Sequence, residues 1–448
     1  MSQDRVTVHE ALKHGDLPTR LSAVVMGAGM MGHRQVVKGV IVLLCEIAFV
    51  VYMVGRGLHD LTMLPSLGTE LYSKVWNEAK QVFEYADGDN SVLILLAGVI
   101  ACLGMLGFVG LWVLQLQHSY RMQRRIERGE DVPTFRRDLA SLLNENLHIT
   151  LMTLPTNGVI IFNVVPLVYM ISMAFTTYSV EGEHLVLFDW DGVNQFARVL
   201  SMDGTIGKQF WGVLQWTIIW AIFATFLNYI LGMVLALIIN RKETRAKGFW
   251  RFCFVLSIAV PQFVTLMIMN IMLQPSGAVN VLLMDLGITT SPVPFWTNTL
   301  LARVTIIVIN LWVGIPYTML QVTGILQNIP AELYEAAKMD GADAIKIFFK
   351  ITLPHMLFVT APYLITSFVS NINNFNVIYL LSGGGPTMVG DSAGQTDLLV
   401  TWLYKLTIDQ QYYNLGAVIG IITFVILTVI TLVTYRHTSS YNNEEAYM

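Results

Sequence analysis

Charged residues are scarce in this sequence. Asp, Glu, Lys and Arg together make up 13% of its 448 residues, about half the share found in ordinary soluble domains. Hydrophobic residues make up 54%, and several apolar runs exceed the ~20 residues that a helix needs to cross a bilayer. This composition excludes an ordinary soluble globular protein and predicts an all-α integral membrane protein.

Cysteine is also rare, and its pattern excludes two kinds of site. The three cysteines, Cys45, Cys102 and Cys253, all fall in apolar segments. Their spacing fits neither a disulfide framework nor a metal site, so they are expected to be small buried hydrophobic residues. The first 35 residues lack a short apolar run followed by a small-residue cleavage site, so no cleavable signal peptide is expected.

No G-x-x-x-x-G-K-[ST] motif occurs, because Gly207-Lys208 is followed by Gln209. Since that motif is what cradles nucleotide phosphates in P-loop proteins, any ATP that drives this protein is expected to bind another polypeptide. The stretch GAGMMG at 27–32 does match G-x-G-x-x-G, but a membrane span follows where a βαβ unit is required. We expect a glycine-rich interfacial turn or helix packed under that span.

Acidic residues are nearly absent from the apolar runs. Glu46 is the only carboxylate well inside one of them, and it is expected to pair with a polar or basic neighbour, the alternative being a proton-coupling role. The predicted spans contain no paired catalytic acids, Ser/Lys dyad or histidine-rich metal set. An enzyme acting at membrane depth is therefore not expected.

Eight membrane spans are predicted from the apolar runs, so both termini lie on one side of the membrane. With the N-terminus inside, 20 of the 27 Lys and Arg residues fall in cytoplasmic segments, which predicts an N-in/C-in orientation. The predicted spans are 38–58, 92–116, 153–176, 211–238, 252–273, 304–325, 356–381 and 413–435.

We expect the last six predicted spans to form one unit and the first two to be an addition to it. A cytoplasmic N-terminal arm covers 1–37, and 38–150 holds two additional spans with a basic cytoplasmic loop, expected to be a solvated face near anionic headgroups. A core of six predicted spans follows over 151–436, and 437–448 is a cytoplasmic tail.

The stretch from Pro330 to Pro354 is the only long polar, helix-forming segment between two strongly apolar ones. A proline suits a first helical position, and Gly341 allows the backbone to turn. The sequence predicts two short helices hinged at Gly341 on the cytoplasmic side, the second ending before Pro354.

Neutral polar side chains recur on two spans at helical spacing. Asn310, Gly314 and Tyr317 share one face of the sixth span, and Ser367, Asn371 and Asn374 share a face of the seventh. Amides, hydroxyls and an aromatic ring suit a neutral polyol such as a sugar. The same groups could equally form hydrogen bonds between helices, so spacing alone leaves both a sugar site and helix packing open.

The 330–354 segment also carries a long motif of fixed spacing. Glu335-Ala336-Ala337, then Gly341 and Ile351-Thr352-Leu353-Pro354, resemble the EAA motif of ABC-importer membrane subunits, and Gly383-Gly384-Gly385-Pro386 extends the match. The chain is thereby similar to the MalF-type permeases of carbohydrate importers, in the family of binding-protein-dependent transport inner-membrane components. The resemblance implies a MetI-like core of six helices with two extra N-terminal helices, a layout typical of the maltose branch.

The resemblance implies two sets of site residues. In that family the EAA segment docks on a separate ATPase, where the acidic residue of the motif, here Glu335, meets a basic group and Ala342 to Phe349 insert. The implied coupling residues are Glu335, Ala336, Ala337, Asp340, Gly341, Ala342, Ile351, Leu353 and Pro354. The implied sugar-binding residues are Asn310, Val313, Gly314, Tyr317, Ser367, Ser370, Asn371 and Asn374. Val313 stands for a leucine and Ser370 for a phenylalanine, so one stacking surface is missing.

The resemblance further implies a transport subunit without a cofactor of its own. Its expected partners are a MalG-like second permease, an ATPase homodimer that binds ATP, an extracellular sugar-binding protein, an oligosaccharide and membrane lipid, but no nucleic acid. The loop at 177–209 is too short for the large extracytoplasmic domain of Gram-negative maltose permeases. This suits a Gram-positive plasma membrane with a lipid-anchored binding protein.

The sugar itself stays open at this point. Residues 393–406 resemble both maltodextrin and arabinogalactan-oligomer permeases, so the cargo is expected to be maltose or maltodextrin, with a galacto- or arabinogalacto-oligosaccharide as the alternative. An ion-coupled secondary sugar transporter is disfavoured, because such proteins use intramembrane acids and the core spans have none.

Overall fold

The computed structural model describes residues 6–436 except Tyr72, Ala79, Asp87 and Lys242. The predicted tail at 437–448 and the first residues of the arm lie outside the described residues. By internal contacts the chain divides into two compact units, Met1–Gly192 and Val193–Met448. The third span groups with the first two in this division, whereas the predicted core begins at 151; that boundary stays a prediction.

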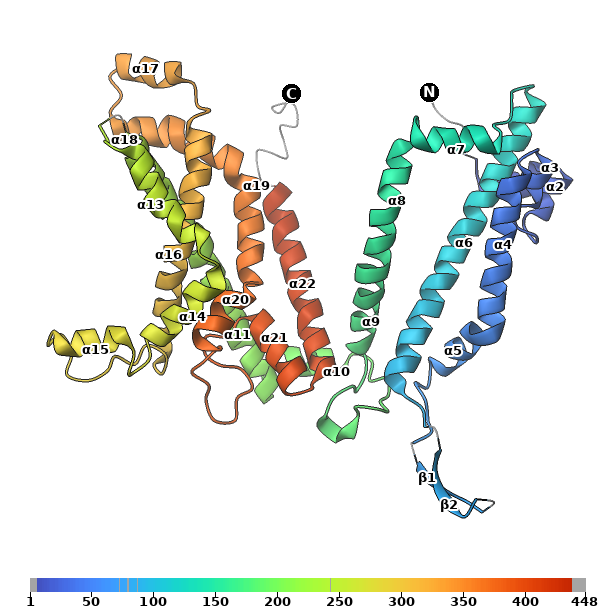
Figure 1. The fold of residues 1–448 in the computed structure, drawn as a ribbon, viewed down its shortest axis with the longest axis horizontal. Coiled ribbons are helices and arrows are strands. Elements are labelled where there is room, and N and C mark those ends of the chain that lie inside the picture. Colours follow the sequence, from blue (N-terminus) through green and yellow to red (C-terminus); the bar gives the residue numbers. More distant parts are fainter. Residues whose placement is uncertain (1–5, 72, 79, 87, 242, 437–448) are drawn as a thin grey trace. The chain divides into compact units, whose positions relative to one another are not determined.

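The N-terminal unit is built from long helices with a short arm at one end and a hairpin at the other (Figure 1). Its elements are α1 (Val8–His14), α2 (Leu17–Leu21), α3 (Ala28–Gly32), α4 (Val36–Tyr52), α5 (Leu58–Met63), β1 (Ser73–Asn77), β2 (Val82–Ala86), α6 (Ser91–Glu127), α7 (Phe135–Leu143), α8 (Leu147–Val159) and α9 (Val165–Met173).

The arm docks on α6 through polar side chains that satisfy its backbone. Gln123 accepts from the backbone N–H of Asp16 at 2.9 Å, Gln115 donates to the carbonyl of Ser22 at 2.7 Å, and Trp112 donates to the carbonyl of Ala23 at 2.9 Å. Asp16 also accepts from His33 at 2.8 Å. Partial burial works against it, but hydrogen bonds from His33 and Thr19 hold the pKa of Asp16 below its usual value.

The glycine-rich stretch and Glu46 have structural roles, as expected. Gly27 has a φ of +84°, and a Cβ there would lie 2.1 Å from the carbonyl oxygen of Gly39, so the turn packs directly against the start of α4. Glu46 accepts a hydrogen bond from the backbone N–H of Met26 at 2.8 Å. The carboxylate inside the first span therefore holds the arm.

A β-hairpin between the first two spans was not predicted. β1 and β2 pair antiparallel, with Trp76 opposite Phe83, and the two rings lie 4.9 Å apart between centroids. Cross-strand aromatic pairs are a common source of hairpin stability. The chain remains mostly helical.

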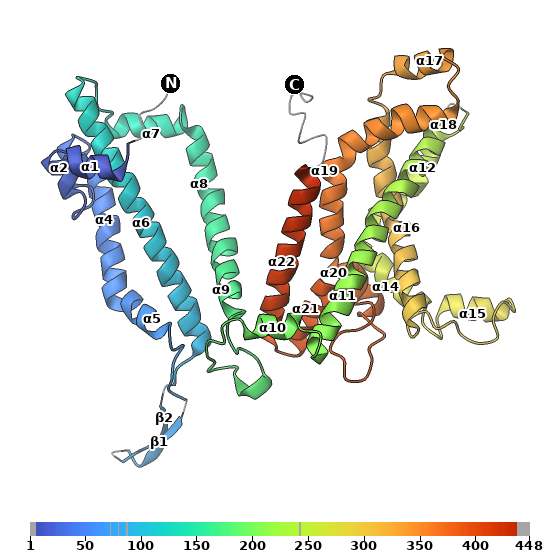
Figure 2. The same cartoon turned by 180° about the vertical axis from the view of Figure 1, so that it is seen from behind.

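The C-terminal unit places its spans between two sets of short helices (Figures 1 and 2). Its elements are α10 (Asn194–Leu200), α11 (Thr205–Ile222), α12 (Asn228–Asn240), α13 (Lys247–Ala259), α14 (Gln262–Met272), α15 (Ala278–Asp285), α16 (Thr299–Leu326), α17 (Ala331–Met339), α18 (Ala344–Ile347), α19 (Leu353–Ile372), α20 (Phe375–Ser382), α21 (Leu399–Tyr404) and α22 (Tyr413–Arg436). Across the described residues of both units, five π-helical turns interrupt or join the helices, at Met53–Gly57, Ile160–Val164, Phe223–Leu227, Phe348–Thr352 and Lys405–Asp409.

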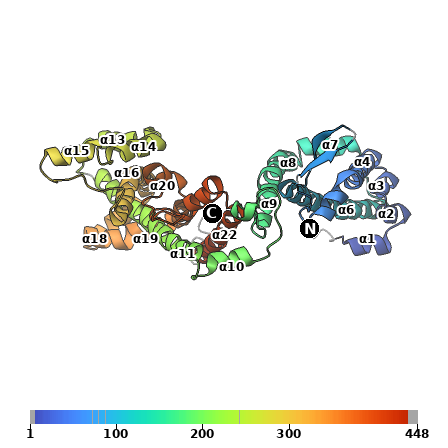
Figure 3. The same ribbon diagram turned by 90° about the horizontal axis from the view of Figure 1, so that it is seen from below.

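Seven helices among the described residues are long and apolar enough to cross a membrane, and one bent pair completes the predicted eight if it crosses once. That pair is α13 and α14, which meet at an angle of 85°. The break lies at Pro261, which cannot donate a helical hydrogen bond and forces Val260 into an extended conformation. In the view from below, α13, α14 and α15 lie together at one edge of the unit (Figure 3).

Two clusters of buried side chains hold the C-terminal unit together. One joins Trp216 and Trp220 of α11 to Ile306 and Ile309 of α16 and to α20. The other joins Tyr229 and Met233 of α12 to α16 and α19. The long helix formed by α11 and α12 therefore packs against both the sixth and the seventh predicted spans.

The expectation for the cysteines was wrong, because all three side chains are exposed on their helices. Helices that face lipid expose apolar residues, so an apolar segment does not identify the buried face. Within each unit, the segments expected in the cytoplasm lie at one end of the spans (Figure 1). The side of the membrane that this end faces stays a prediction.

Candidate functional site

The predicted coupling segment projects from one end of the C-terminal unit as α17 and α18 (Figures 1 and 2). α17 ends at Met339, and Gly341 follows with a φ of +75°. The N–H of Gly341 donates to the carbonyl of Lys338 at 3.1 Å, and that of Ala342 donates to Ala337 at 2.9 Å. These two bonds form a Schellman cap, which needs a left-handed residue where Gly341 stands.

The helix after this turn does not end before Pro354, which corrects the prediction. α18, a π-helical turn at Phe348–Thr352 and α19 form one helix from Ala344 to Ile372. The π-helical turn lies just before Pro354. Pro354 is the second residue of α19, and the N–H that proline lacks breaks no regular helical bond at this position. The coupling segment is therefore continuous with the seventh span.

The surface of the coupling segment is exposed and partly apolar. Leu333, Met339, Ile345 and Phe349 expose between 48% and 83% of their area. Glu335, Ala336, Asp340, Gly341 and Pro354 are exposed, while Ala337, Ala342, Ile351 and Leu353 are half-buried. Such an exposed apolar surface at a membrane protein's aqueous end is typical of a protein-protein contact.

Tyr334, which the sequence did not single out, ties the two halves of the segment together. Its hydroxyl lies 3.2 Å from the hydroxyl of Thr352. This contact joins α17 to the helix that continues into the span.

The predicted polar face of the sixth span points in more than one direction. Asn310 is buried, Val313 is half-buried and Tyr317 is 51% exposed. Gly314 packs against α12, since a Cβ there would lie 2.4 Å from Nδ2 of Asn228. The small size of Gly314 thus has a packing reason as well as an implied binding role.

On the seventh span, Asn371 and Asn374 form a small network. Asn371 donates to the hydroxyl of Thr225 at 3.0 Å, and its carbonyl accepts from Trp220 at 3.0 Å. Asn374 donates to Asn371 at 3.4 Å. Ser367 is half-buried and Ser370 is exposed.

The network lies at a break in the helix that the sequence prediction missed. The span predicted at 356–381 stops at Ile372, and α20 begins at Phe375 as a separate helix. Asn374 caps α20 by accepting from the N–H of Val377 at 3.3 Å. In membrane transporters, broken helices of this kind supply polar backbone groups where substrates bind.

Thr225 and Asn228 connect the two predicted faces. They lie one turn apart on the helix formed by α11 and α12, with Thr225 against Asn371 and Asn228 against Gly314. Asn228 is 8% exposed, and its Nδ2 donates to the carbonyl of Ala224 at 2.7 Å. Its Oδ1 is buried and has no hydrogen-bond partner among the described residues, which leaves an acceptor between the two spans. Thr225 and Asn228 were not predicted from the sequence. Their three-residue spacing in the fourth predicted span, which puts them on one helix face, could have indicated them.

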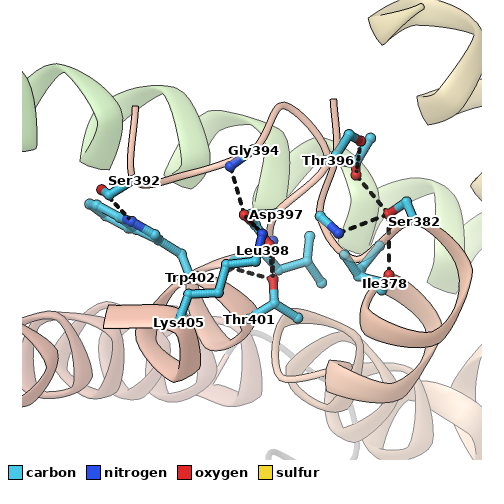
Figure 4. A network of polar contacts seen from close by, with 12 residues as sticks. Ile378, Ser382, Ser392, Gly394, Thr396, Asp397, Leu398, Thr401, Trp402 and Lys405 are labelled. Carbon is cyan, nitrogen blue, oxygen red and sulfur yellow. Dashed lines mark hydrogen bonds and ion pairs between the residues drawn. The ribbon is translucent and has the colours of Figure 1, made fainter. Parts of the chain in front are cut away.

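A second polar network closes the loop between α20 and α21 (Figure 4). The buried carboxylate of Asp397 accepts from Lys405 at 2.7 Å, from the hydroxyl of Thr401 at 2.8 Å and from the N–H of Gly394 at 2.7 Å. Gly384 has a φ of +81°, and a Cβ there would lie 1.9 Å from the same carboxylate. Gly384 is therefore required by the ion pair beneath it.

This loop forms one wall of a cavity of about 280 Å³. Arg303 lies over the ring of Trp216 at 4.5 Å, and Gln209 donates to Asp391 at 2.9 Å and accepts from Ser392. The cavity is lined by polar groups from α11, α16 and the loop. It forms a polar vestibule at the opposite end of the unit from the coupling segment.

Comparison with known proteins agrees with this arrangement. Residues 228–440 match the family described as "Binding-protein-dependent transport system inner membrane component". Two permeases of Bacillus subtilis strain 168 are each 33% identical to the chain: the galactooligosaccharides permease GanP, over 95% of this chain and 98% of its own, and the maltodextrin permease MdxF, over 98% and 99%.

A bacterial ABC transporter that imports alginate has the same fold in its crystal structure. One of its chains superposes with a TM-score of 0.53 at 22% identity, covering 67% of this chain and 97% of that one. The helical architecture, the exposed coupling segment and the full-length relatives lead to one conclusion. The chain belongs to the family of binding-protein-dependent transport system inner membrane components, and it is a multi-pass permease subunit of an ABC importer.

Proposed function

We propose that this permease carries a neutral oligosaccharide of the maltose and maltodextrin class across a Gram-positive plasma membrane. It works with a homologous second permease, an ATPase homodimer that docks on the coupling segment, and a lipid-anchored extracellular binding protein. The chain itself makes and breaks no covalent bond. Its work is to expose a sugar site alternately to the two sides of the membrane.

The observation that carries the proposal is the charge-neutral polar network around Asn371. Thr225, Asn371 and Asn374, with Asn228 one turn from Thr225, supply donors and acceptors without a formal charge, as a polyol requires. The described spans of the C-terminal unit contain no aspartate or glutamate. That composition favours a neutral cargo and gives an ion-coupled mechanism no titratable carboxylate to use.

The continuous helix supplies the mechanical link. Leu353 and Asn371 lie on the same helix, about 27 Å apart along its axis at 1.5 Å per residue. Movement of the docked segment is therefore expected to displace Asn371 through this helix, and Asn374 through its hydrogen bond to Asn371. ATP-driven closure of the ATPase would open the site outward, and hydrolysis would reset it.

A substrate panel tests the class of sugar. The reconstituted complex with its binding protein is expected to hydrolyse ATP faster with maltose or maltotriose than with galactobiose. Stimulation by galactobiose alone would change the cargo to a galacto-oligosaccharide, which the equal identity to GanP and MdxF makes the second candidate. Uptake that persists without ATP would contradict the ABC mechanism itself.

Asn228→Leu is expected to lower sugar-stimulated ATP hydrolysis and uptake at least ~10-fold. Leucine removes the unpartnered Oδ1, and the loss of one buried hydrogen bond to a ligand corresponds to about that factor. Asn157→Leu, an exposed asparagine of α8, is the matched control and should leave both unchanged. Equal activity of Asn228→Leu and the wild type would exclude this residue from the site.

A further inference from the structure

A groove runs between α4 and α6 in the N-terminal unit, at the end that carries the arm and the basic loop. Its volume is about 410 Å³. The walls combine two chemistries, with Ile41, Val42, Leu111 and Leu114 on the apolar part and Lys38 and Arg121 on the basic part. Neither the coupling segment nor the polar network of the C-terminal unit includes these residues.

The two chemistries are separated along the helices. On α4, Ile41 and Val42 follow Lys38 by three and four residues, so all three share one face. On α6, Leu114 and Leu111 precede Arg121 by seven and ten residues, again on one face and over ~15 Å of helix. Both walls therefore change from basic at the end of the span to apolar deeper in it.

The floor of the groove is fixed by the docked arm. Gln115 donates to the carbonyl of Ser22 at 2.7 Å, and His118 lies 2.8 Å from Oε1 of Gln35. The walls above this floor stay open, since Ile41 is 48% and Leu114 is 64% exposed. The groove is thus a preformed concave surface rather than a gap that side chains could close.

One of the two basic side chains at this end of the groove is neutralised by an ion pair, and the other has no such partner among the described residues. Lys38 is paired with Asp138 of α7 at 2.5 Å between Nζ and Oδ2. Arg121 is exposed and has no hydrogen bond or ion pair with any residue that the structure describes. A guanidinium in this position offers paired N–H donors that match a phosphate.

We propose that this groove binds an anionic phospholipid of the cytoplasmic leaflet. The headgroup phosphate lies at Arg121 beside Lys38, and an acyl chain lies along Leu114, Leu111 and Ile41. A basic pocket between spans on the cytoplasmic side fits the known preference of such sites for acidic lipids. The bound lipid would fill the surface between α4 and α6 above the arm.

Binding of fluorescent phosphatidylglycerol and phosphatidylcholine to the intact complex in detergent tests this site. Phosphatidylglycerol is expected to bind more tightly, and Arg121→Gln is expected to weaken it about five-fold, the effect of one basic residue near a membrane surface. Arg136→Gln removes a charge that is also exposed, on α7 and outside the groove, and should change nothing. Leu114→Trp fills the groove without changing charge and should also weaken binding.

Three outcomes would overturn the proposal. Equal binding of the two lipids by the wild type would remove the headgroup preference. Equal losses in Arg121→Gln and Arg136→Gln would show diffuse attraction to a basic surface. Unchanged binding by Leu114→Trp would place the lipid elsewhere. Both Arg121 and Leu114 are exposed, so the variants are expected to fold, and an unchanged elution volume of the complex verifies this.

Discussion

Gly341→Val should reduce sugar-stimulated ATP hydrolysis of the assembled transporter to its basal rate. Gly341 has a φ of +75°, where a β-branched residue is strongly disfavoured. Valine would open the turn and break the bonds from Gly341 to Lys338 and from Ala342 to Ala337. The proposed docking helix α17 would then lose its fixed direction, while sugar binding by the isolated binding protein stays normal.

Gly341→Asn separates backbone conformation from side-chain bulk. Asparagine tolerates the left-handed region better than other non-glycine residues, and beyond the two chain neighbours no described residue comes within 4 Å of the Cβ position. We expect it to retain most of the stimulated rate. If Gly341→Val is stimulated as fully as the wild type, the turn does not transmit the force. A bulky residue at the half-buried Ala337 should also lower the stimulated rate, because it changes the shape of the surface that α17 presents.

The second large effect is expected in stability rather than coupling. Lys405→Met leaves the carboxylate of Asp397, which is 0% exposed, without its cation. Removing one partner of a buried ion pair typically costs about 3–5 kcal/mol. Thermal unfolding of the purified complex in detergent should therefore begin at a clearly lower temperature than for the wild type.

Two controls assign that loss to the buried charge. Lys208→Met removes a lysine at the surface of the nearby vestibule and should leave the unfolding temperature nearly unchanged. The double variant Asp397→Asn with Lys405→Met removes both charges and should recover part of the loss. A double variant as unstable as Lys405→Met would mean that lysine packing, not the ion pair, matters.

Much of the architecture follows from sequence patterns that lipid imposes. Apolar length located the spans, because every backbone group in a bilayer must be paired within a helix. The exposed, glycine-hinged segment after Pro330 followed from its polarity between two apolar runs. Proline was less informative: Pro354 continues a helix through a π-helical turn, whereas Pro261 bends one by 85°. The neighbouring backbone decides between these outcomes, and a single residue type does not reveal it.

The candidate site was only half predictable for a related reason. Spacing along each predicted span singled out Asn310, Asn371 and Asn374 as candidates, but it could not show that the seventh span breaks after Ile372. It also could not show that Thr225 and Asn228 stand between them, since contacts between spans depend on packing. Sequence alone likewise misjudged the cysteines, because an apolar helix does not state which face meets lipid.

The loop between α20 and α21, whose polar network is drawn in Figure 4, offers a position for attaching a spectroscopic label. Its base is fixed by Asp397 and its glycines, but Val389 at the tip is fully exposed and its neighbour Met388 is 60% exposed. A cysteine or a short peptide placed at Val389 would extend from a rigid base without entering the packed interior. Together with a second label on α17, it would let spectroscopy follow both ends of the C-terminal unit during the transport cycle.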